Sequence, residues 1–220
     1  MINQKIPWEA ACRWQQYEAE LRVNVVRIGA IGSFYIVHLV HHLAAASTIP
    51  ILVALGLDAG TPLTNQAHIA ITSIVLSWGI VGLWVHYLLR ERVFPGWLMY
   101  ASTMGDICFL TAILVLTTGP TSPLVVGYFL MIMMSGLRFD LRLVRWSTVT
   151  AILSYVFVLG CAKWPIGLSK LNALPSVPRY QQLMIVLALL LAGIIVGQGV
   201  RQAHHLARRS APASGDEVQP

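Results

Sequence analysis

Long apolar runs separated by short polar connections make up most of the chain. Six of these runs approach the roughly 20 residues that a helix needs to cross the hydrocarbon core of a bilayer. They cover residues 23–46, 66–89, 97–118, 122–137, 143–163 and 181–199. A further apolar stretch, 49–57, is too short to span and suggests a re-entrant or interfacial piece. The pattern predicts an all-α, polytopic membrane protein with six transmembrane helices.

Basic residues divide the connections into two kinds. Arginine is frequent in four of the polar segments: before residue 23, at 89–92, at 137–146 and after 199. The connections 46–65 and 117–123 contain no lysine or arginine, and only 163–179 breaks the contrast. Because cytoplasmic loops carry an excess of these residues, we expect both termini to be cytoplasmic.

The same pattern divides the chain into three parts. Residues 1–22 mix Trp8, Trp14 and Tyr17 with charges, which favours a cytoplasmic or interfacial amphipathic segment. Residues 23–199 form the transmembrane domain. Residues 200–220 continue the sixth helix into the cytoplasm and end in a disordered polar tail, so we expect no fused output domain.

Composition supports the membrane assignment and removes several functional classes. The chain is 56% hydrophobic and 11% charged, whereas a soluble domain is about one quarter charged. The net charge of +6 lies at the edges of apolar runs and not in one patch, so we expect no nucleic-acid partner. Three cysteines without CxxC spacing indicate neither a disulfide framework nor a zinc site. No P-loop, GxSxG, HExxH or kinase motif occurs, so we expect no enzyme and no obligatory cofactor.

Asp106 is an acid inside the third apolar run. It lies about nine residues from the start of that run, or about 13 Å deep at 1.5 Å per residue. A carboxylate at such depth is a candidate functional group, because burying it in lipid is costly unless it is paired or neutralised. The alternative is a structural hydrogen bond to Ser102, Thr103, Ser73 or Ser77.

Histidines gather at the far end of the first run. His38, His41 and His42 have i, i+3 and i+4 spacing, and His68 begins the second run on the same predicted side of the membrane. Imidazoles bind metals and haem iron and donate hydrogen bonds to quinones. These four residues are therefore candidates for a haem, metal or quinone site, with interfacial histidines satisfied by water or backbone as the alternative.

The segment from Asp106 through the "TTGPTSPL" turn to Tyr128 and Phe129 resembles the six-span sensor modules of bacterial sensor histidine kinases and membrane-bound class III adenylate cyclases. In redox-sensing kinases of that group the turn reads Gly-Gly-x-x-Asn-Pro-Phe and is associated with quinone sensing. Gly119, Ser122 and Pro123 match or nearly match that turn, whereas Pro120 and Leu124 depart from it. The resemblance continues into residues 135–159.

This resemblance implies a sensory module in a bacterial inner (plasma) membrane. Its ligand-sensing candidates are Asp106, Gly119, Ser122, Pro123 and Tyr128, and its cytoplasmic signalling and topology candidates are Arg138, Arg142, Arg145 and Arg201.

The leading hypothesis is a module that senses a membrane-soluble or outer-side signal and transmits it through the sixth helix. Its partners would be membrane lipid, a separate cytoplasmic signalling protein, or a second copy packed through Gly193 and Gly197. The alternatives are a haem- or quinone-binding redox protein and a small transporter or scaffold subunit.

Overall fold

A computed structural model describes residues 5–46, 65–91, 96–164 and 177–210. Six α-helices occur in these ranges: α1 (Lys5–Ala46), α3 (Asn65–Arg90), α4 (Leu98–Leu116), α5 (Val126–Gly136), α6 (Leu141–Lys163) and α7 (Arg179–Ser210). Five of them contain segments long and apolar enough to cross a membrane, and the apolar helical segment Pro123–Gly136 is shorter. The prediction of an all-α, multi-pass membrane protein is confirmed. The stretch 49–57 lies outside the described residues.

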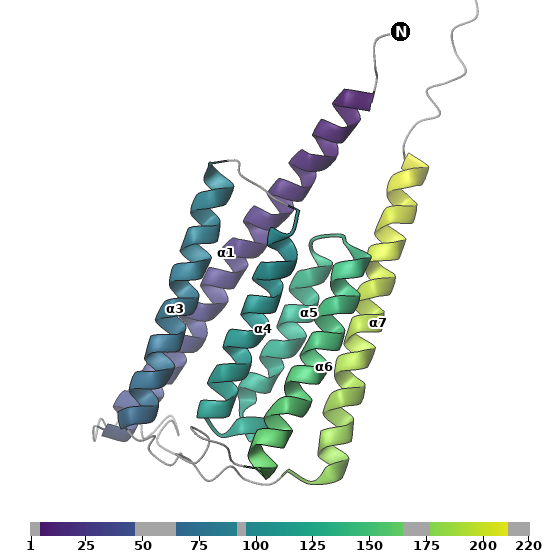
Figure 1. Cartoon of the computed structure of the whole chain (residues 1–220). Helices are drawn as coiled ribbons and strands as arrows, with labels where there is room; N and C mark the ends of the chain where they lie inside the picture. Colours follow the sequence, from purple (N-terminus) through teal and green to yellow (C-terminus); the bar gives the residue numbers. More distant parts are fainter. Residues whose placement is uncertain (1–4, 47–64, 92–95, 165–176, 211–220) are drawn as a thin grey trace, which may run out of the picture.

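The helices stand roughly side by side (Figure 1). α1 packs along α3, α3 along α4, and α4 against α5 and α6, while α7 closes the other side by packing on α5 and α6. α1 is one helix of 42 residues, so the predicted boundary at residue 22 falls inside it. The amino-terminal part of α1 and the carboxyl-terminal part of α7 extend beyond the other helices at the same end of the bundle (Figure 1).

Glycines allow the helices of the α4–α7 bundle to approach closely. A β-carbon added at Gly127 would lie 2.9 Å from Leu110, and one at Gly136 would overlap Val196 of α7. Gly193 of α7 similarly faces Thr148 of α6, so this half of the predicted dimerisation pair packs inside the chain. Among the described residues, no atom outside the adjacent turns of α7 lies within 4 Å of the position that a Gly197 β-carbon would take.

A compact connection joins α4 to α5. It consists of two short 3₁₀ turns, η1 (Gly119–Thr121) and η2 (Pro123–Val125). Gly119 has a φ of 62°, a left-handed conformation that glycine adopts without steric cost. The Ser122 hydroxyl accepts a hydrogen bond from the Leu124 amide at 3.3 Å and so caps the second turn. This connection places the end of α4 directly beside the start of α5.

Candidate functional site

A buried polar face lies near the middle of α1. Glu20, Asn24 and Arg27 follow one another at spacings of four and three residues, which places them on one side of a helix. Their exposed fractions are 0%, 0% and 1%, so the whole face lies inside the protein. The Asn24 amide donates a hydrogen bond to the Gly82 carbonyl of α3 at 3.1 Å. Polar groups buried this deeply must find partners within the protein.

Arg27 is the partner of Asp106. The Arg27 Nε atom lies 2.8 Å from Asp106 Oδ2, and the Trp78 indole N–H donates to Asp106 Oδ1 at 2.8 Å. The other nitrogens of Arg27 donate to Asn24 Oδ1 at 2.9 Å and to the Ser102 hydroxyl at 3.1 Å. The acid inside the third apolar run is thus one half of an ion pair between α1 and α4.

A second buried ion pair joins α1 to the turn between α5 and α6. Arg138 Nη2 lies 2.7 Å from Glu20 Oε1, and Arg138 Nη1 donates to the Met99 carbonyl at 3.1 Å and to the Thr103 hydroxyl. Ser102 connects the two pairs, because its hydroxyl also accepts from Arg138 Nη2 at 3.2 Å. Two arginines and two carboxylates cancel in formal charge. We call Glu20, Arg27, Asp106 and Arg138, with Asn24, Trp78, Ser102 and Thr103, the polar network.

The electrostatics of this network depend on its burial. Desolvation lowers the pKa of the Arg138 guanidinium from its ordinary value, and the Glu20 carboxylate opposes that shift. Among the described residues of the network, Glu20 Oε2, Arg27 Nε and Arg138 Nε have no hydrogen-bond partner, although Arg27 Nε lies within ion-pair distance of Asp106. The Glu20–Arg138 pair therefore retains unused hydrogen-bonding capacity.

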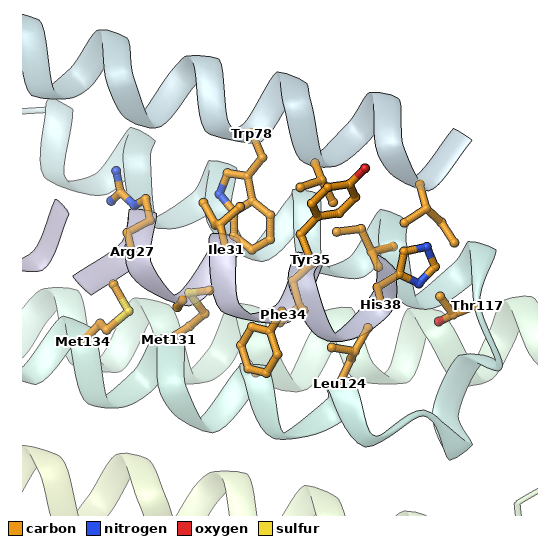
Figure 2. A pocket seen from close by; sticks show the side chains of 16 residues that line it. Arg27, Ile31, Phe34, Tyr35, His38, Trp78, Thr117, Leu124, Met131 and Met134 are labelled. Atoms are coloured by element: carbon orange, nitrogen blue, oxygen red, sulfur yellow. The ribbon is translucent and has the colours of Figure 1, made fainter. Parts of the chain in front are cut away.

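An apolar crevice begins where the polar network ends. It lies between α1, α3, α4 and α5, has a cavity volume of about 50 Å³ and is partly open to the surroundings. Figure 2 shows its side chains along α1, with Arg27 and Met134 at one end and His38 and Thr117 at the other. Phe34 lines the crevice and is 42% exposed, so the crevice reaches the outer surface of the bundle beside it. The α4–α5 connection borders the far end through Thr117 and Leu124.

Three of the four predicted histidines meet at the far end of the crevice. His38 Nε2 lies 3.3 Å from His68 Nδ1, and the His42 and His68 rings stack 3.8 Å apart at an angle of 4°. The side chain of His41 lies outside the described residues. Among the described residues, no group of three or more histidine, cysteine or acidic side chains has a geometry that would hold a metal ion.

This arrangement does not fit a haem. Two axial imidazoles would direct nitrogens at one iron from opposite faces of a macrocycle, about 4 Å apart for bonds of about 2 Å. Here one pair of rings shares a hydrogen bond and the other is stacked face to face. No space for a macrocycle lies between the rings of either pair.

The remaining predicted residues are separated from the crevice or only border it. Tyr128 is fully buried, and its hydroxyl is 2.9 Å from Thr111 Oγ1, which links α5 to α4. Arg142, Arg145 and Arg201 are exposed, whereas Arg138 is buried in the polar network.

Sequence reasoning missed Glu20, Asn24 and Arg27. The sequence feature that could have identified them is a series of polar residues at helical spacing that continues into the start of the first apolar run. Trp78 was also missed, since only the structure brings its indole to Asp106.

The fold and the buried network define a multi-pass helical membrane protein. The chain matches no protein-family model, no curated protein and no solved structure. No family is identified, and the resemblance to sensor modules rests on short motifs within residues 97–159 and on the arrangement of the apolar runs.

Proposed function

We propose that the protein is a membrane-embedded sensory or regulatory module. A membrane-soluble ligand enters the crevice beside Phe34, changes the position of α1, and so alters α7. The exposed edge at Phe34 supports entry from the lipid, because Phe34 lies within the apolar segment Tyr17–Val40 of α1. Such a ligand shifts the protein between two packings only to the extent that it binds one of them more tightly.

The observation that carries this proposal is a continuous set of contacts from the crevice to α7. Arg27 lines the crevice and donates to Ser102, which also accepts from Arg138. Arg138 precedes Phe139, whose carbonyl accepts a hydrogen bond from His204 Nε2 of α7 at 2.9 Å. A displacement of α1 would therefore act on the α5–α6 turn, and through that turn on the end of α7.

The proposed membrane arrangement has six spans, with α5 as the fourth, and cytoplasmic termini. Exposed arginines support it: Arg90 ends α3, Arg142 and Arg145 lie in the first turns of α6, and Arg201 lies late in α7. These helix ends lie at the same end of the bundle as the termini (Figure 1). On this arrangement, α7 meets a separate cytoplasmic protein or a second copy beyond the membrane surface.

The test replaces the ligand with a side chain that fills the crevice. Ala30→Phe places a ring in the crevice, whereas Ser33→Phe places the same ring on the exposed face of α1. Spin labels replace exposed Leu153 of α6 and His205 of α7, with the three native cysteines changed to serine. We expect Ala30→Phe to change the distance between the labels by about 1–2 Å, the size of a typical helix shift, and Ser33→Phe to leave it unchanged.

The contact at His204 provides a second control. Combining Ala30→Phe with His204→Ala should remove the response of α7 while the crevice stays filled. Identical distance distributions in the parent protein and Ala30→Phe would refute the proposal, provided that thermal unfolding shows both to be folded.

A further inference from the structure

The length of the crevice matches one leaflet of a bilayer. Arg27 and His38 are eleven residues apart on α1, or about 16 Å at 1.5 Å per residue. Half of a hydrocarbon core of roughly 30 Å is about 15 Å. His38 lies close to Val40, where the apolar segment of α1 ends, while Arg27 lies near the middle of that segment. The crevice therefore runs from one edge of the hydrocarbon region to its midplane.

The crevice offers a ligand no unpaired charge. Among its lining residues, Arg27 alone bears a formal charge, and its three guanidinium nitrogens face Asp106, Asn24 and Ser102. The inner end is thus neutral, because the Arg27 guanidinium is ion-paired with Asp106 and donates hydrogen bonds to Asn24 and Ser102. A charged group would gain no ion pair anywhere along the lining and would lose its hydration on entry.

The hydroxyl groups of the crevice lining, those of Tyr35 and Thr117, lie at its outer end. The Tyr35 hydroxyl donates to Thr72 Oγ1 at 3.4 Å, and the Thr117 hydroxyl donates to the Leu114 carbonyl at 3.2 Å. Because their protons are used in these bonds, both oxygens are available as acceptors. A head group with a hydroxyl proton complements them, whereas a carboxylate, which only accepts, does not.

We infer that the crevice binds one uncharged single-chain amphiphile with a hydroxyl head, such as a long-chain alcohol or a monoacylglycerol. The head lies beside Tyr35, His38 and Thr117, and the chain runs along α1 toward Met131 and Met134. This orientation is the one that such a molecule already has in a bilayer, so it can enter past Phe34 without turning over. The inference rests on the proposed function and names the chemical class of its ligand.

The test is photo-crosslinking to the full-length protein in lipid nanodiscs. The probe is a 16-carbon alcohol with a diazirine near the end of its chain, and the matched probe is the corresponding carboxylate. We expect the alcohol to label peptides containing Ile31, Met131 or Met134, with displacement by unlabelled hexadecanol. The carboxylate should label them at least fivefold less.

Two pairs of variants locate the chain and the head. Ala30→Phe should reduce labelling at least tenfold, and Ser33→Phe should preserve it. Thr117→Val removes an acceptor at the head and should weaken competition by hexadecanol about three- to tenfold. Thr118→Val, at the adjacent exposed position, should leave competition unchanged.

Any one of three results would overturn the inference. The first is that the alcohol probe labels exposed helix faces generally and that Ala30→Phe does not reduce this labelling. The second is that the carboxylate probe labels the crevice as strongly as the alcohol probe, and the third is that an isoprenoid quinone displaces the alcohol probe at a lower concentration than hexadecanol does. If Ala30→Phe shifts α7 but neither probe labels the crevice, the inferred class of ligand is refuted and the proposed sensory function is retained. If the alcohol labels the crevice but α7 does not respond to Ala30→Phe, the crevice is an amphiphile-binding site and the proposed sensory function is refuted.

Discussion

The α4–α7 bundle and α1 are held in place by different kinds of contact. Within the bundle, glycines fit against side chains of neighbouring helices, as Gly127 does at Leu110 and Gly136 at Val196. α1 instead reaches α4 and the α5–α6 turn through two buried ion pairs, and the crevice follows beyond Arg27. Close glycine packing therefore characterises the bundle, which also contains buried hydrogen bonds such as that between Tyr128 and Thr111, whereas buried ion pairs join α1 to it.

This difference shows how one chain can combine a rigid part with a movable one. Between helices in lipid, close packing and polar contacts provide association, because burial from water contributes little. A glycine contact tolerates almost no displacement of the neighbouring helix. A set of ion pairs and hydrogen bonds around a shared serine can exchange partners, so α1 is the helix most suited to respond to a ligand.

Breaking one ion pair of α1 should have the largest effect on stability. Asp106→Leu leaves the Arg27 guanidinium buried without its counter-charge, and we expect a loss of about 3–5 kcal/mol in the free energy of unfolding. Unfolding in mixed micelles with increasing SDS measures this loss.

The double variant Arg27→Leu with Asp106→Leu is the control. It removes both charges and should recover most of the stability. A loss below about 1 kcal/mol for Asp106→Leu would show that the Arg27–Asp106 pair does not hold α1, and the contrast between the two regions would fail.

The same contrast explains what the sequence alone could predict. Apolar runs predicted the membrane helices, because length and hydropathy are local properties of the chain. They also identified Asp106, since an acid inside an apolar run stands out. Its partner Arg27 lies near the start of the first run, where arginine is also expected as a topology signal, so its burial could not be distinguished from exposure at the membrane surface.

Other features depended on distances between helices. The spacing of the histidines suggested that imidazoles gather at the far end of α1, and His38, His42 and His68 do meet there. The crevice had no signal in the sequence, because its walls come from four helices and its side chains resemble ordinary apolar packing. Gly193 and Gly197 have the spacing of an interface between helices, yet only the structure shows that Gly193 faces Thr148 of the same chain.

A glycine substitution in α7 should have an intermediate effect and tests the packing of the bundle. Gly193→Ala forces its new methyl group against Thr148, and we expect a loss of about 1–3 kcal/mol in the free energy of unfolding. Gly197→Ala has open space and should be neutral or stabilising by less than about 1 kcal/mol, since alanine favours helix. The same SDS titration measures both. If Gly197→Ala is the more damaging variant, α7 is packed by a partner at Gly197 and not by α6 at Gly193.

Removing the hydroxyl groups of two buried tyrosines in the bundle should have the smallest effects on the free energy of unfolding. The two substitutions compare a buried hydroxyl that has a hydrogen-bond partner with one that has none among the described residues. The Tyr128 hydroxyl is bonded to Thr111, so Tyr128→Phe should cost about 0.5–1.5 kcal/mol in the free energy of unfolding. The Tyr155 hydroxyl is buried without a hydrogen-bond partner among the described residues, so Tyr155→Phe should be neutral or slightly stabilising. SDS unfolding of the two variants, each compared with the parent protein, gives the difference directly. An equal cost for both would contradict this prediction and would mean that the Tyr155 hydroxyl has a hydrogen-bond partner outside the described residues.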